Sequence, residues 1–449
     1  MLSRCTEGSL DKLYQRTKGN GKSVRMVLLA KSGFNEDMET AFKDFPEVEL
    51  IQLRREAVKT LSRVFFPREL NDNNYALTDQ YDEAKKQYRA LLRQVWRKLQ
   101  DRQQFDLVLS GNWAYYSERE LAHALTEIDL PFLVCHKECL KTPSQVRGWI
   151  HVYKRYRGPF GGRAMTVYNE TEKHTLVASD VCKPEQIEVV GCPRLDALHH
   201  LRREGRKPNT RKTLLFFAFH PTAAAGLPWI PLPIGIPPRE GADTLPIPGD
   251  PKYLNHWFGF GEDGNLQPSV AWEELSRKTH EAVISLARSR PDIDVLIKVK
   301  VGPHNKEHAD QMLGGELPAN IRIARGGASL EYFQQADAVC AFNSTACLEG
   351  IAAGIPVITP RFAEALLPEA KDCLIELGGA AVTAESPEVL QQRILEVLDA
   401  DCPVTRELTN AQQSVLDEYM GNSDGLAGKR FADFVLNLVG ASADAPTKG

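Results

Sequence analysis

The sequence predicts an α/β protein of two domains, each built on a parallel β-sheet whose strands are connected by helices. The chain of 449 residues is about three times as long as a typical domain. Short apolar runs alternate along it with longer amphipathic segments, which is typical of parallel sheets with crossover helices. A charged stretch with helix-breaking residues, 201–212, separates two such series. We therefore expect one core in each half.

The first series predicts a domain over 23–205, preceded by a polar leader at 1–22. Apolar residues recur at helical spacing over 82–103, between two of its strands. The predicted strands of this domain are 24–30, 48–53, 105–111, 131–137, 164–169 and 187–191.

The second series predicts a domain over 210–405, followed by a final helix and tail at 406–449. A helix is expected at 271–289, and the predicted strands are 213–219, 294–301, 321–324, 336–342 and 356–360. Apolar side chains share one face of a helix at 429–439. We expect that last helix to cross back to the first domain.

A proline-rich insertion at 221–268 interrupts the second domain and holds ten of the 27 prolines. Long insertions are often functional, and its aromatic residues Trp229, Trp257 and Phe258 favour an ordered loop. We expect it to close on a cleft or to contact a membrane-borne acceptor. The alternative is an insertion packed against its own domain.

Composition excludes several classes of protein. Lys and Arg number 55 against 59 Asp and Glu, so no basic footprint of a nucleic-acid binder is visible. The start is polar, and no apolar stretch is long enough to span a membrane. Nine irregularly spaced cysteines favour a reducing compartment over a disulfide framework. We expect a cytoplasmic protein, with peripheral contact at the inner membrane left open.

Three short motifs fail on their context. The pattern Gly259–Gly264 lacks the preceding strand and following helix of a dinucleotide fingerprint. A glycine-lysine-serine triplet at 21–23 precedes a strand instead of following one. Cys135 and Cys139 have no second Cys/His pair at a zinc-site distance. No metal or redox cofactor is expected.

The segment 328–360 is different, because a polar turn, Asn343-Ser344-Thr345, stands between a strand and a nearly apolar helix. Asn or Ser can cap that helix, whose N-terminus then offers backbone N–H groups and positive potential to a phosphate. Open α/β sheets bind ligands at this end of their strands. Glu349 follows Thr345 by one helical turn and is placed to accept hydrogen bonds from a ribose diol. The alternative is a capped structural helix with a surface Glu.

The same segment, through Leu348-Glu349 and 353–358, resembles the donor site of GT-B glycosyltransferases, most closely the bacterial capsule and surface-polysaccharide group that includes the Kdo transferases. The run 189–196 is similar to their V-x-G-x-P-R-x-D junction, and 424–430 to the segment that opens their last helix. The resemblance covers roughly 165–440. It implies two Rossmann-like domains facing across a cleft, an N-terminal acceptor domain and a C-terminal nucleotide-sugar donor domain. It also places Arg194 among the donor-binding residues.

The sequence departs from that group in two places. The family's His-Pro pair is reversed here as Pro303-His304, while His220-Pro221 follows the first strand of the second half. The family's acidic-acidic-Gly base motif lies in the first half, whereas Glu262-Asp263-Gly264 lies in the second. CMP- and UDP-linked donors therefore both stay open. We take His304 as a donor-binding candidate and expect Lys298 or Lys300 to hold the leaving phosphate.

The catalytic base is expected on a loop of the first domain. Its candidates are Glu36 and Asp37 after the first strand, and His136 and Glu138 after the strand that ends near Cys135. For each of these the alternative is a solvated loop residue or a satisfied strand-end histidine.

These observations predict a metal-independent glycosyltransferase that moves a sugar from a nucleotide donor to a surface glycan, of capsule or lipopolysaccharide type. A glycan or lipid-linked glycan is the expected acceptor, and no nucleic acid is expected as a partner. The alternatives are a nucleotide-sugar epimerase or hydrolase of the same fold, a polyol-phosphate transferase, or an inactive scaffold that binds glycan.

Overall fold

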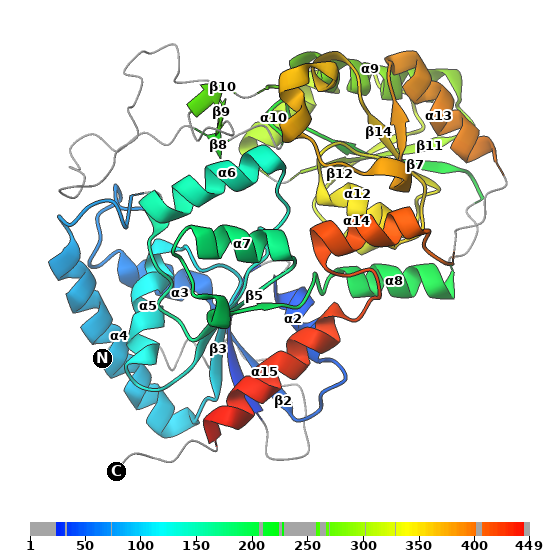
Figure 1. The fold of residues 1–449 in the computed structure, drawn as a ribbon. Helices are drawn as coiled ribbons and strands as arrows, with labels where there is room; N and C mark the ends of the chain where they lie inside the picture. Colours follow the sequence, from blue (N-terminus) through cyan, green and yellow to red (C-terminus); the bar gives the residue numbers. More distant parts are fainter. Residues whose placement is uncertain are drawn as a thin grey trace.

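The computed structural model describes two α/β domains and the helices that join them (Figure 1). The described residues are 24–31, 34–72, 74–205, 210–223, 227–228, 257–260, 266–268, 270–300, 302–327, 329–400 and 406–443.

The first domain holds a six-stranded parallel sheet in the order β2-β1-β3-β4-β5-β6. Its strands are β1 (Val24–Ala30), β2 (Val48–Arg54), β3 (Leu107–Ser110), β4 (Phe132–Cys135), β5 (Ala164–Val167) and β6 (Ile187–Val189). Its helices are α2 (Phe34–Phe42), α3 (Arg55–Ser62), α4 (Asp82–Gln103), α5 (Tyr116–Thr126), α6 (Pro143–Val152), the π-helix η1 (Tyr153–Arg157), α7 (Glu170–Ala178) and the short η2 (Pro184–Gln186). Strands β3, β4 and β5 are buried along their whole length, as expected when helices cover both faces of a parallel sheet.

The second domain repeats this plan with a six-stranded parallel sheet in the order β12-β11-β7-β13-β14-β15. Its strands are β7 (Thr213–Ala218), β11 (Asp294–Val299), β12 (Ile321–Arg325), β13 (Ala338–Cys340), β14 (Val357–Pro360) and β15 (Val382–Ala384). Its helices are α9 (Glu273–Ser289), α10 (Pro303–Met312), α11 (Ser329–Phe333), α12 (Thr345–Ala352), α13 (Pro387–Asp399) and α14 (Asn410–Met420), with the 3-10 turns η4 (Ala363–Leu366), η5 (Pro368–Cys373) and η6 (Gly378–Ala380). The predicted fold class is confirmed.

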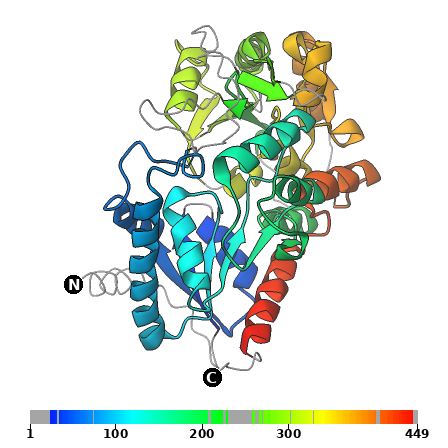
Figure 2. The same cartoon turned by 60° about the vertical axis from the view of Figure 1, so that its left-hand side comes forward.

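The domains are joined through α8 (Leu195–Glu204) and through the last helix, α15 (Ala427–Ala443), which runs along the first domain (Figure 2). Phe431 and Val435 of α15 are fully buried in a cluster with Met26 and Phe34 of the first domain. The Phe431 ring lies 5.7 Å from that of Phe42. The last helix therefore completes the core of the first domain.

The glycine and aspartate of the junction motif have structural roles. Gly191 has a φ of +84°, and a Cβ built there would lie 2.3 Å from the carbonyl oxygen of Gly421. Asp196 accepts hydrogen bonds from the backbone N–H groups of Ala427 and Gly428 at 3.2 and 2.7 Å. The motif thus seats α15, because only glycine allows the close approach and a carboxylate satisfies the free N–H groups of the helix start.

The described parts of the proline-rich insertion form a small antiparallel sheet of β8 (Leu227–Pro228), β9 (Trp257–Phe260) and β10 (Leu266–Pro268). This sheet leaves the second domain after β7 and lies against α6 of the first domain (Figure 1). Trp229 and the side chains of Trp257 and Phe258 lie outside the described residues. The expectation that the insertion closes on the site stays a prediction.

Candidate functional site

The predicted phosphate-binding turn lies where the second sheet reverses its strand order. Strand β7 pairs with β11 on one side and with β13 on the other, and the pair Phe216–Cys340 fixes the register of β7 and β13. Four residues beyond that pair stand His220 and Ser344. Such a switch point is where open α/β sheets bind ligands. The turn and His220 are therefore neighbours at the carboxyl edge of the sheet.

The turn Asn343-Ser344-Thr345, called the cradle below, is fixed by its own hydrogen bonds. Ser344 caps α12, and its hydroxyl accepts the N–H of Ala346 at 3.2 Å. Asn343 has a φ of +42°. Its side chain donates to the carbonyl of Cys373 at 2.8 Å and accepts the N–H of Ile375 at 2.9 Å. Asn343 therefore shapes the turn, while Ser344 and Thr345 stay half-buried at the helix start.

Glu349 lies one turn deeper in α12 and is 3% exposed. Its carboxylate is hydrogen-bonded by the side chains of Ser329 and Thr345, and its Oε1 lies 3.8 Å from Nη1 of Arg194. Burial raises the pKa of Glu349, and the Arg194 charge and the two hydroxyls oppose that rise. The carboxylate thus lies at the contact between the two domains, and its predicted ribose contact stays a prediction.

Arg194 connects the two sets of predicted site residues. It precedes α8, and its Nη2 donates to the hydroxyl of Tyr168 at 3.4 Å. The pKa of Arg194 is held well above its usual value, first by Tyr168 and further by Cys192, Glu349 and Asp37. The guanidinium of Arg194 therefore interacts electrostatically with a carboxylate of each domain, Asp37 from α2 and Glu349 from α12.

Charged side chains gather at the strand ends of the first domain. Lys31 follows β1, Lys137 and Glu138 follow β4, and Asp37 lies on α2; we call these four the charge cluster. Burial lowers the pKa of both lysines, and the charge of Glu138 opposes the effect at each. Glu138 is exposed, whereas Lys31 and Lys137 are half-buried. Glu138 is thus the predicted base that combines an accessible carboxylate with neighbouring cations. The side chain of Glu36 lies outside the described residues.

His136 is placed differently from the prediction. It is 2% exposed, and its Nε2 lies 3.1 Å from Oε1 of Glu172, a fully buried residue of α7. Lys141 also pairs with Glu172 and donates to the carbonyl of Glu138 at 2.6 Å. Both of its ring nitrogens are enclosed, so the structure favours the alternative of a buried strand-end histidine over a base. The network instead holds the loop that carries Glu138.

The predicted phosphate contacts of β11 and α10 are only partly supplied by the structure. Lys298 is 9% exposed, donates to the carbonyl of Gly326 and lies 4.6 Å from the centre of the Tyr332 ring. The ammonium of Lys298 is thus hydrogen-bonded within the second domain, which does not favour the predicted contact with the leaving phosphate. Lys300, just after β11, is exposed, and the side chain of His304 lies outside the described residues. Lys300 and His304 both stay candidates for the phosphate contact.

The sequence reasoning did not assign a role to His220, although the His220-Pro221 pair was visible. Its Nδ1 accepts the N–H of Thr222 at 3.2 Å. His308 of α10 packs against it, with ring centroids 4.9 Å apart. The half-buried His220 therefore adds an imidazole ring beside the cradle.

Glu118 was also missed, because nothing distinguishes it from other acidic residues on helix α5. It is 1% exposed and accepts hydrogen bonds from Ser110 at 2.6 Å and from Arg55 at 2.8 Å. Burial raises the pKa of Glu118 to about 7, against the opposing effects of Ser110 and Arg55. Glu118 influences the pKa of Lys31, so it lies behind the charge cluster as a titrating group.

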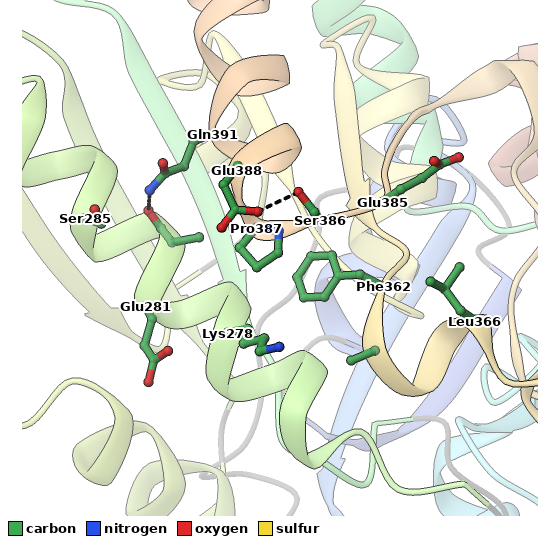
Figure 3. A pocket seen from close by; sticks show the side chains of 12 residues that line it. Lys278, Glu281, Ser285, Phe362, Leu366, Glu385, Ser386, Pro387, Glu388 and Gln391 are labelled. Carbon is green, nitrogen blue, oxygen red and sulfur yellow. Dashed lines mark hydrogen bonds between the residues drawn. The ribbon is translucent and has the colours of Figure 1, made fainter.

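A pocket of about 650 Å³ lies between α9, η4 and α13 (Figure 3). Some of the polar groups that line it are hydrogen-bonded to one another. Ser386 donates to Glu388 at 2.7 Å, and Gln391 donates to the carbonyl of Ala282 at 2.8 Å. None of the residues that line it is a predicted site residue. The pocket is therefore separate from the cradle.

Within the described part of the chain, no helix is long and apolar enough to cross a membrane. Among the same residues, no three His, Cys, Asp or Glu side chains are grouped as a metal ion would require.

No protein-family model matches this sequence, and no curated protein matches it. Solved structures resemble it. A protein from Listeria monocytogenes assigned as a UDP-N-acetylglucosamine 2-epimerase is 13% identical, with a TM-score of 0.50 over 93% of this chain and 97% of that chain. S. aureus MnaA in complex with UDP is 12% identical, with a TM-score of 0.49 over 95% and 99% of the two chains. A variant of the wall teichoic acid polymerase TagF is 9% identical, with a TM-score of 0.48 over 95% and 91%.

Sequence identities this low show that the fold is similar and do not establish a shared activity. The two six-stranded parallel sheets, their flanking helices and the returning α15 define a two-domain α/β protein of the GT-B type. The narrower likeness to the Kdo-transferase group rests on the sequence motifs.

Proposed function

We propose that this protein is a glycosyltransferase that takes a sugar from a nucleotide donor bound at the cradle and transfers it to a glycan acceptor bound at the first domain. The observation that carries the proposal is the pairing of two sites through Arg194. An anion-binding helix start with His220 lies on one side, and a charge cluster with the exposed Glu138 lies on the other.

The cradle is suited to the donor's phosphates. The start of α12 supplies positive potential, and Ser344 and Thr345 supply hydroxyls. These groups stabilise the charge that develops on the phosphate oxygen as the bond to the sugar breaks. Glu349 and Arg194 are placed to contact the ribose one helical turn away.

Glu138 is suited to activate the acceptor. An exposed carboxylate can take the proton of an acceptor hydroxyl as that oxygen attacks the anomeric carbon of the sugar. The new glycosidic bond forms, the nucleotide leaves with the electrons of the broken bond, and the proton stays on Glu138. Lys31 and Lys137 are neighbouring cations of Glu138 and can hold an anionic acceptor or donor group beside it.

A 2-epimerase is the second candidate function, favoured by one observation. The exposed Glu138 and the buried Glu118, whose pKa is about 7, both act on Lys31. Two carboxyl groups, one exposed and one buried, could remove and return a proton at a sugar carbon. The Listeria protein that shares this fold is assigned to that activity.

One experiment separates these candidates. The purified protein is incubated with CMP-, UDP-, GDP- and CDP-linked sugars in deuterated water, with and without a glycan acceptor. A transferase releases nucleotide only when acceptor is present and exchanges no sugar hydrogen. An epimerase incorporates deuterium at C2 without acceptor. Binding of none of these donors in calorimetry would overturn the proposal.

A further inference from the structure

A group of buried polar side chains in the first domain has donors that are left unpaired. Trp113 and Arg119 are 3% and 8% exposed. Among the described residues, no hydrogen-bond partner reaches the indole Nε1 of Trp113 or Nη1 of Arg119. A buried donor without a partner costs about 1–3 kcal/mol, so native proteins leave few of them. Two such donors on neighbouring side chains suggest a common partner.

The two donors belong to one cluster. The guanidinium carbon of Arg119 lies 5.8 Å from the centre of the Trp113 ring. The Trp113 ring meets Tyr153 at 5.2 Å between centroids. Tyr153 opens the π-helix η1, and Arg157 closes it. Arg157 acts on Arg119 as a like charge, which together with burial lowers the pKa of Arg119 to about 10.

The neighbouring carboxylates are engaged elsewhere. Glu120 accepts hydrogen bonds from Tyr75 and from Arg89, the latter at 2.6 Å. Asp72 attracts both arginines, its carboxylate accepts the N–H of Tyr116 at 2.6 Å, and its backbone carbonyl accepts from Arg157. An indole N–H and a guanidinium can only donate. The cluster therefore presents donors and positive charge, which suit an anion and exclude a cation.

The position of the cluster connects it with the charge cluster. Trp113 follows the end of β3, the strand next to β1, at the switch point of the first sheet. A single-turn π-helix such as η1 is frequently found at functional sites, and here Gly158 ends it at a φ of +65°.

We propose that Trp113, Arg119 and Arg157 form an anion-binding site in the first domain, which takes the carboxylate or phosphate group of an acidic acceptor. The anion accepts from the indole N–H of Trp113 and the guanidinium N–H of Arg119 and compensates the charge of Arg119. The anion site stands on its own contacts; the identification of the anion as an acceptor group rests on the proposed function.

Calorimetry with three probes tests the site: glucuronate for a carboxylate, glycerol 3-phosphate for a phosphate ester, and inorganic phosphate for a free ion. Glucose is the neutral control. Trp113→Phe deletes the N–H and keeps an aromatic ring, and we expect it to weaken anion binding about tenfold, as for one hydrogen bond to a charged group. The matched control is Trp96→Phe, a buried tryptophan of α4, which leaves anion binding unchanged.

The outcomes are distinct. Binding of an organic anion that Trp113→Phe weakens supports the acceptor site. Binding of inorganic phosphate alone supports the anion site and overturns its assignment to an acceptor. If no probe binds, or if Trp113→Phe and Arg119→Met leave binding unchanged, water completes these donors and the proposal fails. Nucleotide binding by Arg119→Met, measured in parallel, tests the cradle separately, so the two proposals fail independently.

Discussion

The strand ends of the two domains are built in contrasting ways. In the second domain a continuous segment, 342–349, supplies the turn, the capped helix and the buried carboxylate. In the first domain the corresponding groups come from separate loops after β1 and β4 and from α2. The residues of the cradle are thus close together in the sequence, whereas those of the charge cluster are brought together only by the fold.

The chemistry of the two sites differs accordingly. The cradle offers neutral hydroxyls and a helix start, groups that suit a phosphate and do not themselves titrate. The charge cluster offers two lysines whose pKa values are lowered by burial and raised by the charge of the neighbouring Glu138. We infer that the second domain supplies binding and that the first supplies proton transfer. Four changes test this division.

The largest effect is expected for Glu138→Gln. The amide keeps the size of the side chain but cannot take a proton, so kcat should fall about 10²–10⁴-fold, the range of general base catalysis. Nucleotide affinity in calorimetry should stay within about twofold, because the cradle is intact. A matched control is Glu127→Gln, which removes a half-exposed carboxylate of the same domain. Unchanged kcat in Glu138→Gln would remove Glu138 as the base.

The second effect concerns pH. The pKa of Glu118 is raised to about 7 from its ordinary 4.5, so the folded state binds this proton more tightly than the unfolded state. The contribution of this proton to the free energy of unfolding is therefore fully present below about pH 4.5. That contribution, about 3 kcal/mol in total, is lost as the pH rises through about 7.

Glu118→Gln removes this titration, so the free energy of unfolding, measured in urea at several pH values, should decline less across that window. A curve for Glu118→Gln that declines as steeply as that of the unchanged protein would contradict the assignment of this proton.

The third effect concerns the cradle. Ser344→Ala with Thr345→Val removes two hydroxyls and keeps the helix start, so nucleotide binding should weaken by about 1–3 kcal/mol. Calorimetry with UDP and CMP measures it, and circular dichroism checks the fold. Equal affinity in the double variant would show that phosphates bind elsewhere.

The smallest effect is expected for Glu349→Gln. A ribose contact contributes to substrate and transition state alike, so KM for the donor should rise several-fold while kcat changes little. Steady-state kinetics at saturating acceptor separates the two constants. A loss of kcat at constant KM would move Glu349 into the catalytic step.

The sequence predicted the sheets and the cradle because both are local patterns. Apolar runs such as 24–30 and 294–301 coincide closely with β1 and β11, since a buried parallel strand must be apolar on both faces. The cap of α12 by Ser344 is likewise visible in the residues beside it.

The first-domain site could not be predicted in the same way. His136 and Glu138 stand two residues apart, yet one is enclosed by Glu172 and the other is exposed. Lys298 has the residue type of a phosphate ligand but is engaged by Gly326. Only the tertiary structure decides which neighbour satisfies a polar side chain, and Glu118 acquires its pKa of about 7 chiefly by burial.

The return of α15 to the first domain has a consequence for the order in which the protein is made. A ribosome finishes β6, the last strand of the first sheet, about 240 residues before it begins α15. At roughly 5–20 residues per second, that interval is on the order of 10–50 s. Throughout it, Met26 and Phe34 lack the covering side chains of Phe431 and Val435. The first domain is therefore translated first but completed last, and its nascent apolar face is a natural binding surface for a chaperone.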